Sequence, residues 1–140
     1  MKILLAVDGS DVSTRAVKHV IGLVRKMSAP PELVLLNADT PLLQAAAVKI
    51  GIAGVERYHQ ENGECATKAS RAALNRAKVP FTEKLVVAEP AEAIIEEARK
   101  GRHDLIVMGS HGRGAIKGLL LGSVTSKVIA NCGTPVTVVR

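Results

Sequence analysis

The chain alternates short, continuous apolar runs with longer segments in which apolar residues recur at helical spacing. The clearest runs are KILLAV at Lys2–Val7, LVLLN at Leu33–Asn37 and DLIVM at Asp104–Met108. Runs of this length are typical of parallel strands that are buried on both faces. Because helical segments separate them, the pattern predicts a parallel sheet covered by helices.

The remaining elements follow from weaker patterns. Two partly alternating segments, Thr82–Val87 and Thr134–Val139, predict strands near the edges of the sheet. Four helices are predicted: one capped by Ser10, one that ends near Ala77, one that begins at Pro90, and one that runs from about Ser123 to Gly133. The stretch from Asp39 to about Val55 is rich in alanine but has no firm period.

These elements predict one α/β domain over residues 1–140, with five strands and helices on both faces of the sheet. The length of 140 residues is sufficient for a substantial core. If the first and fourth strands are neighbours, the strand order is 3-2-1-4-5, as in Rossmann-like and flavodoxin-like folds. In such sheets ligands bind beyond the carboxyl ends of the strands, where the strand order reverses.

Composition argues against several function classes. The net charge is +6, but the basic residues are scattered, and Tyr58 and Phe81 are the only aromatic residues. Binding of single-stranded nucleic acid or of a flavin usually relies on aromatic stacking, so we expect neither. No apolar run approaches the roughly 18–20 residues that cross a bilayer, so we expect no membrane partner. Cys65 and Cys132 have no metal-site spacing and are expected to be reduced thiols in a cytoplasmic protein.

A glycine-rich segment follows the fourth predicted strand. It reads GSHGRGAIKGLLLGSVTSK, and it matches the pattern G-x2-G-x9-G-[ST] at Gly109, Gly112, Gly122 and Ser123. Glycines allow the backbone to turn tightly and to approach a ligand, while the free N–H groups at a helix start suit an anion such as phosphate. Arg113 would add positive charge at the rim. The alternative is that these glycines serve only tight turns and a helix cap.

A second candidate lies after the first strand, where Asp8 begins the sequence DGS. At the point where the strand order reverses, Asp8 would face the same crevice as the glycine-rich segment. Its carboxylate could contact a ligand, or it could simply stabilise the turn.

Three segments together resemble the universal stress protein family, in its ATP-binding branch. ILLAVDGSDVS resembles the opening strand and turn of that family, IVMGSHGRGAIKGLLLGSVTSKVI resembles its nucleotide motif, and TPVTVV resembles its closing strand. Where the family often has glycine before the third helix, this chain has Ala88-Glu89-Pro90.

The resemblance implies roles for individual residues. It implies that Asp8 contacts the ribose or adenine side of the nucleotide and that the backbone of Ala38 contacts adenine. The ribose and phosphates are implied to lie against the motif, and the implied nucleotide site there comprises Met108, Gly109, Gly112, Arg113, Gly122, Ser123 and Val124.

The function implied is that of an ATP-binding regulatory module in the stress response, with Mg²⁺ or Mn²⁺ carried by the phosphates. The alternative is a weak ATPase or a self-phosphorylating enzyme. Asp8 is the only carboxylate expected near the site, so we expect the site to bind ATP well and to hydrolyse it poorly. The resemblance also implies a homodimer that pairs through Val136–Val139 and an unidentified protein partner.

Overall fold

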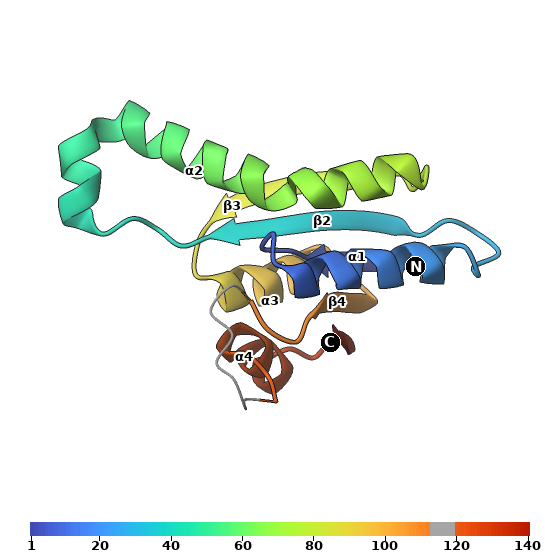
Figure 1. Ribbon diagram of the computed structural model, residues 1–140. Coiled ribbons are helices and arrows are strands. Elements are labelled where there is room, and N and C mark those ends of the chain that lie inside the picture. The colour runs from blue at the N-terminus through green and yellow to red at the C-terminus, as the bar shows by residue number, and fades with distance from the viewer. Residues whose placement is uncertain (113–119) are drawn as a thin grey trace.

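The computed structural model describes residues 1–112 and 120–140. The described elements alternate strictly along the chain (Figure 1). The strands are β1 (Lys2–Ala6), β2 (Glu32–Asp39), β3 (Thr82–Val87), β4 (Leu105–Gly109) and β5 (Val136–Val139). The helices are α1 (Asp11–Val24), α2 (Gln44–Arg76), α3 (Pro90–Lys100) and α4 (Ser123–Asn131).

All four strand pairs are parallel, and the order is β3-β2-β1-β4-β5. The predicted fold class and strand order are therefore confirmed. The order reverses between β1 and β4, where Ala6 pairs with Met108 near the carboxyl ends of both strands. β3 and β5 are the edges of this sheet, as their alternating sequences predicted.

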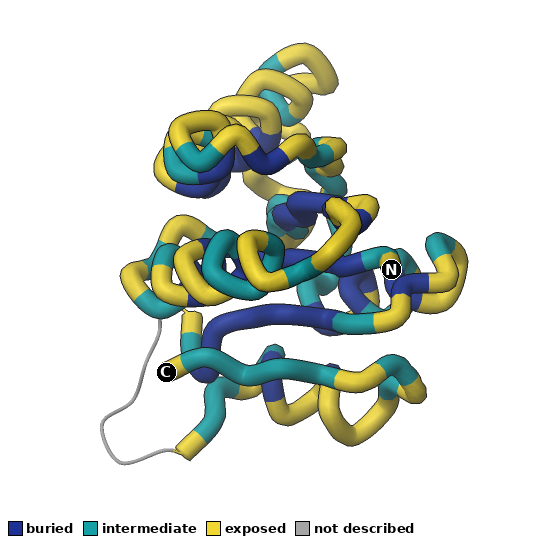
Figure 2. Tube along the Cα trace, turned by 90° about the vertical axis from the view of Figure 1, so that its right-hand side faces the viewer, coloured by how far each residue is buried: buried dark blue, intermediate teal, exposed yellow. Residues whose placement is uncertain are grey.

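Two apolar layers sandwich the sheet, because successive side chains of a strand point to opposite faces. In β1, Ile3 and Leu5 pack with Val17 of α1 and Leu74 of α2, whereas Leu4 packs on the face covered by α3 and α4. Figure 2 shows the buried residues concentrated in the inner strands, with exposed residues on the outer sides of the helices.

The segment without a firm period is helical from Gln44 onward, so the second helix begins well before the sequence predicted. Its residues are good helix formers but are mostly exposed, and an exposed helix needs no amphipathic pattern. Gly51 has φ 71° and ψ 173°, which breaks the helix into a first segment, residues 44–50, and a longer second segment. We call residues 44–50 the arm; Figure 1 shows it standing away from the sheet.

Side chains cap the amino ends of α1 and α3. Ser10 caps α1, since its hydroxyl accepts a hydrogen bond of 3.1 Å from the amide of Ser13. Glu89 takes the same role for α3, accepting from the amide of Glu92 at 2.9 Å. The departure at Ala88-Glu89-Pro90 therefore still gives a capped helix.

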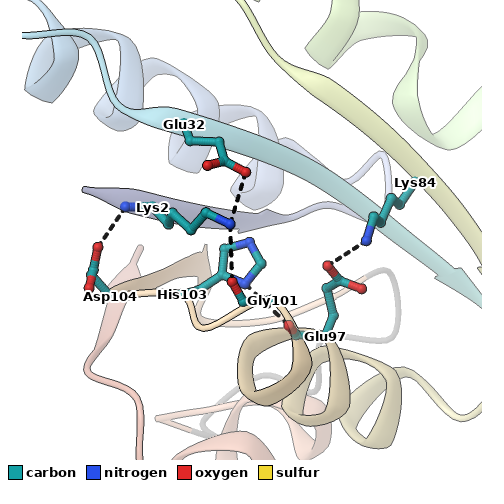
Figure 3. Close-up of polar contacts among 7 residues, drawn as sticks. All are labelled: Lys2, Glu32, Lys84, Glu97, Gly101, His103 and Asp104. Carbon is teal, nitrogen blue, oxygen red and sulfur yellow. Dashed lines mark hydrogen bonds and ion pairs between the residues drawn. The ribbon is translucent and has the colours of Figure 1, made fainter.

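Charged contacts link β1, β2, β3, α3 and the segment before β4 (Figure 3). The Nζ of Lys2 lies 3.0 Å from Oε1 of Glu32, and its backbone amide donates to the carboxylate of Asp104 at 2.7 Å. On α3, Glu97 pairs with Lys84 of β3 at 2.7 Å. Exposed pairs of this kind contribute at most about 1 kcal/mol each. The contacts of Lys2 lie at the amino-terminal end of the sheet, whereas the pair of Lys84 and Glu97 ties α3 to the edge strand β3.

Candidate functional site

A cavity of about 480 Å³ opens at the carboxyl ends of β1 and β4. We call it the switch-point cavity. Its size is within the range of roughly 300–1,000 Å³ that is usual for small-molecule sites. The strand ends, the turn after β1, the segment after β4 and the first turns of α3 and α4 all contribute to its wall.

Asp8 forms the polar wall on the β1 side. Gly9 follows it with φ +79°, a left-handed conformation that suits glycine and turns the chain away from the strand. Oδ1 of Asp8 accepts a hydrogen bond of 3.0 Å from the amide of Ser10. This bond fixes the carboxylate at the cavity wall.

Two motif glycines allow close approach of the backbone on the β4 side. A Cβ on Gly109 would lie 3.0 Å from Cγ1 of Val12 and 3.3 Å from the carbonyl oxygen of His111. A Cβ on Gly112 would lie only 2.7 Å from Oδ2 of Asp8. The segment after β4 therefore lies directly against the Asp8 carboxylate, and a larger residue at position 112 would displace one of them.

The amino end of α4 completes this side of the cavity. Gly122 is the N-cap residue and has no side chain that could cap the helix, and its amide donates to the carbonyl of Ser110 at 2.7 Å. The hydroxyl of Thr125 is buried and donates to the carbonyl of Gly109 at 2.9 Å, which ties α4 to β4. The amide groups of Ser123 and Val124 lie in the first turn, where a helix has no internal acceptors. Both residues line the cavity, so an anion there would meet the positive end of the helix dipole.

The remaining wall is mostly apolar. Leu36 and Ala38 of β2, Met108 of β4, and Pro90 and Ile94 of α3 line it. Among the lining residues that the structure describes, none is Phe, Tyr or Trp, and Asp8 is the single carboxylate. A flavin held between aromatic rings therefore has no support from this cavity.

The structure brings eight of the nine predicted site residues to this one cavity: Asp8, Ala38, Met108, Gly109, Gly112, Gly122, Ser123 and Val124. Arg113 lies outside the described residues. The cavity is also lined by residues that were not predicted as site residues, among them Ser13, Thr40, His111 and Thr125. Position provides the missing signal for two of them, because Thr40 directly follows a predicted strand end and Thr125 lies one turn into the last helix.

The described residues give no support for a metal site or for a membrane-spanning helix. In residues 1–112 and 120–140, no group of three or more His, Cys, Asp or Glu side chains could hold a metal ion. The described helices also include none that is both long and apolar enough to cross a membrane. Cys65 is exposed and Cys132 is half-buried, and neither is in a disulfide in the structure.

Solved structures of similar proteins share this architecture. The protein MJ0577 of Methanocaldococcus jannaschii superposes with a TM-score of 0.84 at 30% identity, over 99% of this chain and 94% of that one. A universal stress protein solved in complex with cAMP superposes with a TM-score of 0.71 at 29% identity, over 100% of this chain and 97% of that one.

Sequence comparison points to the same group. The universal stress protein MJ0531 of Methanocaldococcus jannaschii is 34% identical over 139 residues, which cover 99% of this chain and 81% of that protein. The model of the universal stress protein family matches residues 1–140. The chain belongs to the universal stress protein family.

Proposed function

We propose that this chain is an ATP-binding regulatory module that takes the nucleotide into the switch-point cavity. The observation that carries the proposal is the meeting of three elements at one wall: the Asp8 carboxylate, the backbone at Gly112 and the first turn of α4. Together they offer an acceptor for a sugar hydroxyl and donors for phosphate within one small cavity.

The adenosine would lie toward the apolar part of the wall. Ala38 is at the end of β2, where the small side chain leaves room for a flat base beside Met108. The backbone groups of Ala38 would read the edge of adenine, and Asp8 would accept a hydrogen bond from a ribose hydroxyl. A carboxylate has only acceptor oxygens, so it suits a hydroxyl and would repel a phosphate.

The phosphates would lie at the amino end of α4. Gly122 has no side chain, and a Cβ there would lie 3.2 Å from Cα of His111, so the cap and the segment after β4 are tightly packed. The amides of Ser123 and Val124 and the hydroxyl of Ser123 would donate to phosphate oxygens. Because the described lining has a single carboxylate, Mg²⁺ or Mn²⁺ would enter bound to the phosphates.

The relative solved with cAMP supports an adenine nucleotide as the ligand, at 29% identity over nearly the whole of both chains. The preference for ATP rests on the helix start, because a triphosphate makes more contacts with amide donors than a monophosphate does. Phosphoryl transfer usually needs further positioned groups besides one carboxylate, so we propose binding as the main activity rather than catalysis.

The test begins with purified protein, which is denatured so that any released nucleotide can be identified by chromatography. Calorimetric titration of Mg-ATP, ADP, AMP and cAMP follows on the wild type and on Gly122→Val. We expect ATP to bind most tightly, and we expect the variant to lose at least tenfold in affinity because a β-branched side chain obstructs the first turn of α4.

Gly133→Val is the matched control. Gly133 follows the same helix, and a Cβ there would meet nothing within 4 Å. It should bind ATP as the wild type does. Absence of any nucleotide binding by the folded wild type would refute the proposal. If Gly122→Val binds ATP with the wild-type affinity, the phosphates do not lie at the amino end of α4.

We also propose that two copies pair through the free edge of β5. The carbonyls of Pro135 and Val139 accept hydrogen bonds from the β4 side at 2.9 and 2.7 Å, so the backbone groups of Val136 and Val138 point the other way. Light scattering should give a dimer for the wild type and for Val138→Ala. Val138→Pro removes the outward N–H and should give a monomer; a monomeric wild type would refute the pairing.

A further inference from the structure

A second cavity, of about 510 Å³, lies on the other face of the β2 end, between β2, β3 and α2. We call it the arm cavity, because Ala47 of the arm forms part of its wall. Most of its lining is apolar and includes Leu42, Val55 and Leu85. The nucleotide proposal does not involve this cavity.

One polar side chain in the arm cavity is buried and only half satisfied. His59 is 8% exposed, and its Nδ1 lies 2.6 Å from Oδ2 of Asp39. Asn62 donates to the same oxygen at 3.0 Å. The ring of Tyr58 meets the imidazole edge-on, at a centroid distance of 5.2 Å, which limits its rotation.

The other ring nitrogen faces the cavity. Nε2 of His59 has no hydrogen-bond partner among the described residues, and it is not one of the fully enclosed polar atoms. Because His59 lines the arm cavity and Nε2 is not fully enclosed, we infer that this nitrogen opens into the cavity. An imidazole nitrogen that has no partner within the protein can bond to a ligand or to water.

The hydrogen-bond network determines what Nε2 can bind. A carboxylate only accepts hydrogen bonds, so the hydrogen of a neutral imidazole lies on Nδ1, toward Asp39, and Nε2 is an acceptor. Glu56 and Asp39 also line this cavity and bring two carboxylates. The cavity therefore suits a hydrogen-bond donor and disfavours an anion.

We propose that the arm cavity binds a small, uncharged molecule with an apolar body and one hydroxyl group, such as a phenol. The apolar body would fill the space between the arm and β3, and the hydroxyl would donate to Nε2 of His59. The volume of the cavity is in the usual range for ligands of this size. The proposal is independent of nucleotide binding, because the two cavities lie on opposite faces of the sheet.

Three probes with the same ring system test the chemistry: naphthol, methoxynaphthalene and naphthoate. Each is titrated into the full chain in the presence of saturating Mg-ATP, and binding is followed by calorimetry and by the ¹⁵N signals of the four histidine side chains. We expect naphthol to bind about tenfold more tightly than methoxynaphthalene, which cannot donate a hydrogen bond. Naphthoate should bind least, and the Nε2 signal of His59 should shift with naphthol only.

Three variants locate the binding. Ala47→Trp fills the cavity from the arm and should abolish binding of naphthol, whereas Ala46→Trp, at an exposed position that does not line the cavity, should leave it unchanged. His59→Phe should bind naphthol and methoxynaphthalene equally.

Equal binding of these two probes by the wild type would overturn the proposal. So would naphthol binding that leaves the His59 signal unmoved, or no binding at all. Titration of Mg-ATP into the same variants reports on the nucleotide proposal separately, since none of the three substituted residues lines the switch-point cavity.

Discussion

The contact between Gly112 and Asp8 allows the proposed nucleotide site to be tested with a single methyl group. In Gly112→Ala the new Cβ would lie 2.7 Å from Oδ2 of Asp8, whereas an ordinary contact begins at 3.4 Å. The carboxylate must therefore shift by about 0.7 Å, or the segment after β4 must move by the same amount. A shift of the carboxylate would weaken the proposed hydrogen bond between Asp8 and a ribose hydroxyl, and a shift of the segment would change the wall that faces it.

The expected loss follows from the value of one hydrogen bond to a charged group, about 1.5–3 kcal/mol. That corresponds to an increase of about 10- to 150-fold in the Kd of Mg-ATP, measured by calorimetry. The control is Gly133→Ala, because nothing lies within 4 Å of a Cβ at that position. It should retain the wild-type affinity.

A double-mutant cycle tests the cause rather than the size of the effect. If Gly112→Ala acts by displacing the carboxylate, it should change affinity less than twofold when Asp8 is already replaced by alanine. A full loss in the Asp8→Ala background would show that the methyl group blocks the nucleotide directly. Wild-type affinity in the folded Gly112→Ala variant would refute the role of Asp8.

Three further predictions concern the scaffold. Thr125→Val leaves the carbonyl of Gly109 without its buried donor, so the free energy of unfolding in urea should fall by about 1–3 kcal/mol. Ser10→Ala removes the cap of α1 and should cost about 0.5–2 kcal/mol in the same measurement. On the exposed side of α3, the ammonium of Lys100 bonds to Glu96 and lowers the pKa of that carboxyl below its ordinary value, an effect that is lost as the pH falls through the lowered pKa. In Lys100→Ala, an NMR titration should show the pKa of Glu96 higher than in the wild type.

The sequence predicted the sheet well, because buried parallel strands leave a strong signal. Runs such as KILLAV have no polar interruption, and each becomes an inner strand with neighbours on both sides. The strand order followed from the assumption that the ends of the first and fourth strands meet, and β1 does pair with β4.

The arm was missed because nothing in its sequence pattern reports burial. Ala45 and Val48 are exposed, so no apolar stripe marks a helix there, and only the high helix propensity of the segment favours one. The arm cavity was missed for a different reason. His59 and Asp39 lie on separate elements, and their contact depends on how α2 folds back over the sheet.

The end of β2 supplies one wall to each cavity. Leu36, Ala38 and Thr40 line the switch-point cavity, while Asn37, Asp39 and Pro41 line the arm cavity. Alternate residues of a strand point to opposite faces, so deletion of one residue within β2 would exchange the two sets.

Such a deletion would turn an amide and a carboxylate toward the proposed adenine position and remove the partner of His59. Insertions and deletions within β2 should therefore not be tolerated. The connection between Pro41 and the arm can vary in length without changing which β2 residues line each cavity. In a family with this fold, insertions and deletions should accumulate in that connection and stop abruptly at the strand.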